Sequence, residues 1–360
     1  MRNPFSKYFS LPHDVKIIIY SSFFAGLAYF PLGMILPSFL PLEGVPVPVV
    51  GMLFTLMGVS GTIFSLFIGG IANRYGKKKI AIISGFIGSL IILAFGLTTD
   101  VLILYSASIV AGFVDAASMA TIGVLLADKT SEIERTNAFS FSFFLSNLAM
   151  FFGGIFPLIL LYISNSTGYS FIGLHRYLFI TLSIVGLLDP ILLFKISEDK
   201  KETKIFNFLP RKSMKIFIKY VTASGILAFG AGLVIPLFPT WILLRFNLSD
   251  AYSGPLLSIT GLFIALSSLA TPFLSERIGV VKTIVLTQLS STIFLFIIPF
   301  IPSFFFVSII YIIRSFLMNM SNPAENALIL GIVHPEERAI VSSIGSIFWR
   351  LPTSLSTFIG

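Results

Sequence analysis

Long apolar runs, separated by short polar turns, occupy most of the chain from about residue 15 onward. A helix that crosses a bilayer needs about 20 predominantly apolar residues, and eleven segments reach that length. We therefore predict an all-α, polytopic membrane protein. The eleven segments cover roughly 15–40, 47–72, 79–98, 101–127, 136–163, 171–195, 217–244, 251–274, 281–301, 303–330 and 338–360.

One polar connection, 196–216, is far longer than the others and divides the predicted spans into six and five. It mixes lysine and arginine with acidic residues, as expected for a solvated linker between two membrane domains. We predict an N-terminal six-helix bundle over 1–195, a cytoplasmic linker over 196–216 and a C-terminal bundle of five helices over 217–360.

Positive charge lies almost wholly on one side of the predicted membrane. Twenty of the 24 Lys and Arg residues fall in the N-terminus, the linker and alternate loops. The loops on the other side hold only Arg176 and Arg245, while Arg314 and Arg350 lie inside spans. Because cytoplasmic loops concentrate Lys and Arg, we place the N-terminus in the cytoplasm, in a multi-pass protein of the cell (plasma or inner) membrane.

Composition supports the bilayer as solvent and narrows the chemistry. Hydrophobic residues make up 56% of the chain and charged residues 11%, whereas a soluble domain carries about 25% charge. The net charge of +8 follows from membrane orientation, so we expect no nucleic-acid partner. With no cysteine and three scattered histidines, we expect no disulfide, metal site or other cofactor. The sequence shows no pairing of a nucleophile with a base, so we do not expect an enzyme.

A cationic turn between the second and third spans recurs in weaker form about 200 residues later. The first copy covers 69–79 and the second 272–282, with Asn73 and Glu276 in matching places (276 − 73 = 203). The same offset relates Arg135, after the fourth span, to Arg338, after the tenth. Parallel repeats of this kind place a substrate site between the two halves, near the membrane midplane.

The 69–79 stretch resembles the loop motif of the major facilitator superfamily, Gly-x-x-x-Asp-Arg-x-Gly followed by three Arg or Lys. Asn73 replaces the usual acid. The 123–139 stretch resembles this family's passage from the fourth to the fifth helix. The resemblance implies two six-helix bundles, of which 11 of 12 helices are present here, and a shortened chain is the simplest explanation. The matching residues are Gly69, Arg74, Gly76, Lys77, Lys78 and Lys79.

The resemblance also implies a gating role for this region. Arg74 is expected to pair with Asp128 at the inner end of the fourth helix. Asn73 would face the acidic start of the eleventh helix, 335–337. We hypothesise that this contact, which we term the latch, is weaker here than with the usual acid. The alternative is that a neutral amide is merely tolerated at this position. Glycines at Gly69 and Gly76 would allow close approach and chain reversal. The predicted gating residues are Gly69, Asn73, Arg74, Gly76, Lys77, Asp128, Arg135, Glu276 and Arg277.

Ionisable side chains inside spans are costly, roughly 2.5–3.5 kcal/mol each, and therefore suggest function. Asp115 lies in the fourth span, and Arg314, Asn322 and Glu325 share one face of the tenth. By resemblance these helices line a central cavity, where Asp115 and Arg314 would face each other. Asp115 is then a proton-coupling carboxylate, a static partner of Arg314 or a contact to a cationic substrate. Glu325 either acts directly or is solvated at the inner end.

Three further polar residues lie within spans. Arg350 and Asn147 are repeat mates (350 − 147 = 203), and we interpret both as polar contacts between helices at the domain interface. Asp189 precedes Pro190 near the inner end of the sixth span, which predicts a kink with an acid that snorkels to water.

The predicted function is secondary active transport of a small solute by alternating access. Drug or small-molecule efflux is favoured because the cavity helices look apolar, with proton coupling as one option. Uptake of an organic anion or nutrient, using Arg314, is the alternative, and a non-transporting membrane protein of the same fold is a rival from another class. No phosphate loop is present, so ATP does not drive the process. We expect a monomer in the lipid bilayer.

Overall fold

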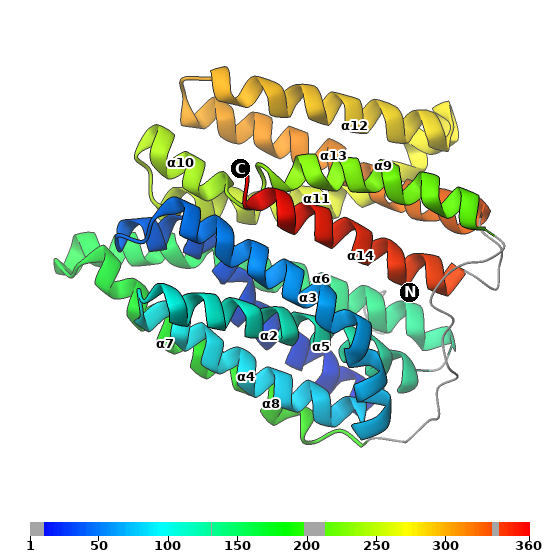
Figure 1. Ribbon diagram of the computed structural model, residues 1–360, viewed down its shortest axis with the longest axis horizontal. Helices are drawn as coiled ribbons and strands as arrows, with labels where there is room; N and C mark the ends of the chain where they lie inside the picture. The colour runs from blue at the N-terminus through cyan, green and yellow to red at the C-terminus, as the bar shows by residue number, and fades with distance from the viewer. Residues whose placement is uncertain (1–10, 131, 198–212, 333–337) are drawn as a thin grey trace, which may run out of the picture.

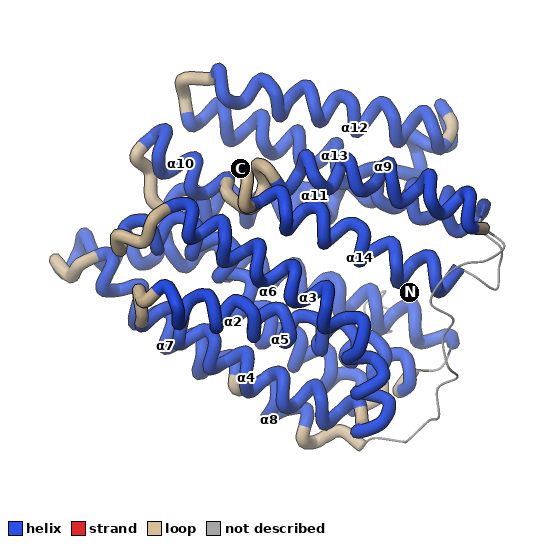
Figure 2. Tube along the Cα trace, in the orientation of Figure 1, coloured by secondary structure: helices blue, strands red, loops and turns tan. Residues whose placement is uncertain are grey.

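The computed structural model describes residues 11–130, 132–197, 213–332 and 338–360. Within these ranges every regular element is a helix, joined by short loops (Figure 2). The predicted all-α class is therefore confirmed.

The first half of the chain forms helices that pack around a buried aromatic and aliphatic core. Phe39, Phe95 and Phe179 are its largest fully buried side chains. We term this group the N-terminal bundle. Its helices are α2 (His13–Leu42), α3 (Val47–Tyr75), α4 (Lys77–Leu97), α5 (Val101–Asp128), α6 (Glu132–Thr167), α7 (Phe171–Gly186) and α8 (Leu188–Leu193).

The second half forms a group that we term the C-terminal bundle. Its core includes the stacked rings of Phe238 and Tyr311, whose centroids lie 4.0 Å apart. In Figure 1, α12 lies on the far side of this bundle and α14 lies beside α3. The division of the chain at the 196–216 linker stays a prediction. The elements are α9 (Met214–Gly232), α10 (Phe238–Phe246), α11 (Asp250–Ile278), α12 (Val280–Ile297), the 3-10 turn η1 (Ile298–Phe300), α13 (Phe304–Ile332) and α14 (Arg338–Thr357).

Nine candidate spans among the described residues are long and apolar enough to cross a membrane. The predicted spans 251–274 and 338–360 correspond to α11 and α14, and both helices include residues whose side chains lie outside the described part of the structure. Both helices pack against the other bundle, α11 on α6 and α14 on α3.

Two predicted spans are broken rather than continuous. A proline removes one backbone N–H and clashes with the carbonyl four residues earlier, and α7 ends at Gly186, four residues before Pro190. The predicted kink is thus confirmed. The prediction of one helix over 217–244 is wrong, because residues 233–237 separate α9 from α10, with Pro239 in the first turn of α10.

The two halves repeat the same tight turn. Gly76 joins α3 to α4 with φ of 100°, and Gly279 joins α11 to α12 with φ of 88°. Residues other than glycine rarely adopt such positive φ values, which explains why glycine occupies both positions. The two turns are 203 residues apart (279 − 76 = 203), the offset predicted from the sequence.

The two ends of the bundles need names. We term the end with the Gly76 and Gly279 turns the inner end and the opposite end the outer end, following the predicted orientation. Close contacts between the bundles lie toward the outer end. Thr240 of α10 donates a hydrogen bond to the carbonyl of Pro37 in α2, and Thr55 of α3 donates to the carbonyl of Ser354 in α14 at 2.8 Å.

Candidate functional site

An ion pair joins the two bundles near the middle of α5 and α14. Nη2 of Arg350 lies 2.7 Å from Oδ2 of Asp115. The arginine side chain is 29% exposed and the carboxylate 39%. Space for solvent-sized molecules therefore lies beside both groups. A charged pair at this depth can be broken by protonation of the carboxylate or by a competing cation.

The predicted pairing of Asp115 with Arg314 is wrong. Arg314 is only 7% exposed and belongs to the interior of the C-terminal bundle. Ser291 of α12 donates a hydrogen bond to the Arg314 carbonyl at 3.0 Å, so this stretch of α13 lies against α12. Nε of Arg314 has no hydrogen-bond partner in the described part of the chain. The depth of Arg314 was predictable, but the direction in which its helix turns it was not.

Glu325 is also held by α12 rather than by the N-terminal bundle. Its Oε1 accepts hydrogen bonds from Gln288 Nε2 and, at 3.0 Å, from Ser321 Oγ. Asn322 is exposed at the edge of the same face and donates to Asn319 Oδ1 at 3.2 Å. The predicted shared face of α13 is therefore turned toward α12, and a direct role of Glu325 in transport stays a prediction.

The cationic turn holds the inner end of the N-terminal bundle together. Lys77 Nζ lies 2.8 Å from Oδ2 of Asp128, so the partner of Asp128 is Lys77 and not Arg74 as predicted. Lys77 opens α4 and follows the turn, which brings its ammonium group to the end of α5. Arg74 is exposed, with Cζ 5.5 Å from the ring centroid of Tyr75.

Lys78 also contacts the end of the sixth span. Its Nζ donates to the carbonyls of Phe194 at 2.9 Å and Ile196 at 2.6 Å. Lysines near a helix C-terminus satisfy carbonyls that have no partner within the helix. Two lysines of the turn thus tie α4 to α5 and to the segment after α8.

Among the described residues, a Cβ at Gly69 would meet nothing within 4 Å, so the close approach predicted there stays a prediction. A tight contact between α3 and α5 lies at Gly112. A Cβ on Gly112 would lie 2.5 Å from the backbone nitrogen of Gly61. Gly112 therefore lets these two helices approach closely about one turn before Asp115.

Other predicted gating residues are not tested by these contacts. Arg277 is exposed at the end of α11. The side chains of Asn73, Arg135 and Glu276, and residues 335–337, lie outside the described part of the structure. The weaker latch at Asn73 stays a prediction.

Comparison with known proteins decides the family. Residues 18–357 match the family described as Major Facilitator Superfamily. The chain belongs to the major facilitator superfamily. Members of this superfamily are multi-pass membrane transporters, which agrees with the predicted class of protein and with a small-molecule substrate.

Relatives of known name share parts of this transporter's sequence or its fold. Multidrug resistance protein 2 of Bacillus subtilis (strain 168) is 33% identical over 130 residues, which is 35% of this chain and 32% of that protein. The match spans about a third of the relative's length. A bacterial homologue of the human lysosomal transporter Spinster, inward-facing and occupied, superimposes with a TM-score of 0.75 at 13% identity, over 99% of this chain and 82% of that one.

Two further solved structures show the same architecture. A variant of the nucleoside transporter NupG gives a TM-score of 0.74 at 14% identity, over 96% of this chain and 90% of that one. A D-xylose-proton symporter gives 0.72 at 16% identity, over 96% and 89%. At such identities the likeness shows the fold alone.

Sequence reasoning missed a buried polar pair at the outer end of this transporter. His175 Nε2 lies 2.6 Å from Asp250 Oδ2, and both side chains are fully buried. The histidine was counted only as one of three scattered ones. An ionisable residue inside a predicted span was the signal that could have found it.

Asp189 is buried, and the prediction that it snorkels to water is wrong. Its carboxylate packs against the backbone of Gly85 in α4, where a Cβ would come within 2.8 Å of Oδ2. The break before Pro190 turns this short helix toward α4 and α2. Because of that turn, the Asp189 carboxylate is buried rather than exposed.

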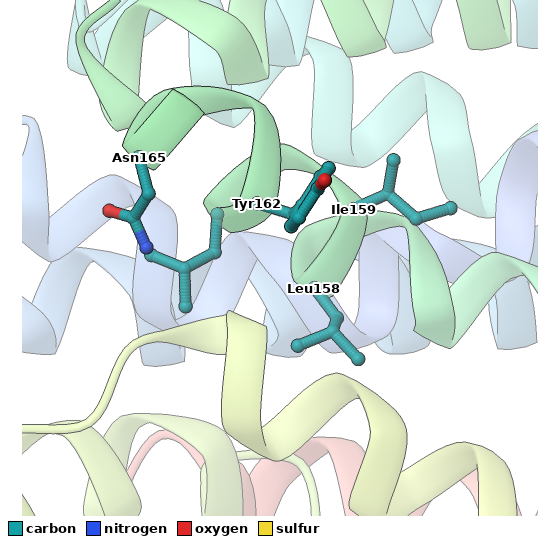
Figure 3. A pocket seen from close by; sticks show the side chains of 5 residues that line it. Leu158, Ile159, Tyr162 and Asn165 are labelled. Carbon is teal, nitrogen blue, oxygen red and sulfur yellow. The ribbon is translucent and has the colours of Figure 1, made fainter. Parts of the chain in front are cut away.

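A hollow of about 480 Å³ lies on the outer part of α6. Figure 3 shows Leu158, Ile159, Tyr162 and Asn165 around it. The side chains of Leu158, Ile159 and Tyr162 are exposed on the surface that would meet lipid. Neither Asp115 nor Arg350 lines this hollow, so we do not assign it to the transported solute. Among described residues, no group of three His, Cys, Asp or Glu could hold a metal.

Proposed function

We propose that this protein is a secondary active transporter that exports a small, largely apolar solute across the cell membrane in exchange for protons. Its N-terminus and linker lie in the cytoplasm. The observation that carries the proposal is the ion pair of Asp115 and Arg350, which joins the two bundles at 2.7 Å.

The pair suits a coupling role because its two partners move with different bundles. An ionised carboxylate at this depth is held by the guanidinium, and together they are neutral. When Asp115 takes up a proton, it loses its charge and its hold on Arg350, so α14 is free to move relative to α5. A cationic solute that binds Asp115 has the same effect on the pair. Protons and solute would thus compete for one carboxylate.

Two observations favour export of an apolar or cationic solute. Tyr29 of α2 donates to the carbonyl of Ala111 at 3.4 Å, one turn before Asp115, and places an aromatic group near the carboxylate. Arg314, the residue that would recognise an anion, is buried inside the C-terminal bundle. The partial relative named Multidrug resistance protein 2 points the same way.

Proteoliposomes test the proposal with ethidium, a lipophilic cation, as probe. An acidic lumen is expected to drive ethidium into the vesicles in exchange for protons. Asp115→Asn removes the titrating group, so gradient-driven accumulation is expected to stop. Asp100→Asn is the matched control, because Asp100 is an exposed aspartate that caps the same helix through the N–H of Leu102 at 2.9 Å. Accumulation by Asp115→Asn at the rate of the control would overturn the role of the pair.

A further inference from the structure

A fully buried His–Asp pair joins the two bundles at the outer end. His175 lies on α7 and Asp250 opens α11, with 2.6 Å between Nε2 and Oδ2. We propose that this pair is a proton-binding site that must be occupied for the bundles to close at the outer end. The proposal goes beyond the transport function above, because it holds for any substrate and for either direction of transport.

The hydrogen bonds of His175 fix the number of protons in the pair. Nδ1 lies 2.8 Å from the carbonyl oxygen of Phe171. A carbonyl only accepts, so Nδ1 carries a proton and donates it. Nε2 and Oδ2 of Asp250 then need one proton between them, because a bare imidazole nitrogen and a carboxylate oxygen are both acceptors. Whichever partner carries that proton, the closed pair has no net charge.

Burial makes loss of this proton incompatible with a closed outer end. Phe39 stacks on the imidazole with 5.1 Å between ring centroids, and Phe171 meets it edge-on at 4.6 Å. The second carboxyl oxygen, Oδ1 of Asp250, has no hydrogen-bond partner among the described residues. Without the proton, one negative charge would remain in a buried enclosure where no described group donates to Oδ1, which strongly disfavours that form.

Neighbouring charged and titratable groups are engaged elsewhere or lie at the surface. Glu43 and Arg176 pair with each other at 3.0 Å, and Tyr311 is buried against the Phe238 ring. Asp100, Arg245 and Tyr252 are exposed. Of the described groups, Asp250 is therefore the one that reaches the imidazole. The groups considered are Glu43 directly after α2, Asp100 before α5, Arg176 on α7, Arg245 on α10, Tyr252 on α11 and Tyr311 on α13.

Opening the outer end would separate α7 from α11 and expose both groups to water. There a histidine is ordinarily neutral and an aspartate ionised above about pH 7. The closed state then holds one proton more than the open state. Low outer pH therefore favours closure, and the preference is lost as the pH rises. One proton of difference lowers the ratio of closed to open molecules by about tenfold per pH unit above about pH 7.

Spin labels can report this equilibrium without any transported solute. The chain contains no cysteine, so Leu102→Cys and Leu244→Cys place two labels at exposed outer positions of opposite bundles. Distances would be measured by pulsed electron paramagnetic resonance in nanodiscs from about pH 5.5 to 9, a range that brackets ordinary histidine titration. We expect short distances at low pH and a growing long-distance population above pH 7.

Two substitutions separate this pair from other titrating groups. Asp250→Asn supplies an amide N–H that donates to Nε2 without a removable proton, so the loss of closure above pH 7 is expected to disappear. Glu43→Gln removes the outer carboxylate that pairs with Arg176 and should leave the pH response unchanged. A wild-type distance that does not respond to pH would overturn the proposal. So would a wild-type response in Asp250→Asn, or loss of the response in Glu43→Gln.

Discussion

Replacing Gly154 with alanine is expected to push the bundles apart at the outer end. Gly154 of α6 lies where this helix crosses α11. A Cβ at this position would collide with Ser258 Oγ and would lie 2.7 Å from the backbone oxygen of Gly254. Ser258 cannot turn away freely, because its hydroxyl donates to that same oxygen at 3.0 Å.

The size of the effect follows from this geometry. An ordinary contact begins at 3.4 Å, so the two helices must separate by about 0.7 Å (3.4 − 2.7 = 0.7). Overpacking of a close contact typically costs about 1–3 kcal/mol. If the contact exists only while the outer end is closed, the same energy shifts the equilibrium toward the open state by roughly 5- to 150-fold.

The distance between labels at Leu102→Cys and Leu244→Cys measures that shift. Gly123→Ala is the control, because a Cβ at Gly123 meets no described atom within 4 Å. Gly254→Ala, on the opposite side of the crossing, should act like Gly154→Ala, since its Cβ would meet the Gly154 carbonyl. A distance distribution in Gly154→Ala that equals the control would refute the view that this crossing closes the outer end.

Two further predictions concern the cationic turn. Gly76→Ala forces a side chain into a backbone conformation with φ of 100°, so we expect a loss of about 1–3 kcal/mol, seen as a lower melting temperature in detergent; melting at the temperature of Gly123→Ala would contradict this. Lys77→Gln is expected to lower the melting temperature more than Arg74→Gln, because Lys77 is the buried partner of Asp128 and Arg74 is exposed; equal effects would argue against that division of roles.

The helices were predictable because they depend on local properties. Apolar length and the placement of Lys and Arg can be read along the chain without knowledge of what each helix touches. The turns at Gly76 and Gly279 were likewise marked by residue type and by a constant offset. Breaks at Pro190 and before Pro239 depend on single residues and are visible once proline is taken into account.

Partners between helices were not predictable in the same way. A change of one residue in helix phase rotates a side chain by about 100°, which is enough to turn Arg314 from the bundle interface into the bundle interior. Arg350 was interpreted as a polar contact at the domain interface, but its partner Asp115 lies 235 residues earlier (350 − 115 = 235). His175 and Asp250 belong to opposite bundles, and no local pattern connects them.

The most direct test of the transport mechanism is the sign of the flux when the gradient is reversed. Ethidium is measured in proteoliposomes without ATP, first with an acidic and then with an alkaline lumen. Exchange for protons predicts accumulation against the ethidium gradient in the first case and extrusion of preloaded ethidium in the second, both abolished when the pH gradient is collapsed. Ethidium movement that ignores the direction of the pH gradient would contradict the mechanism.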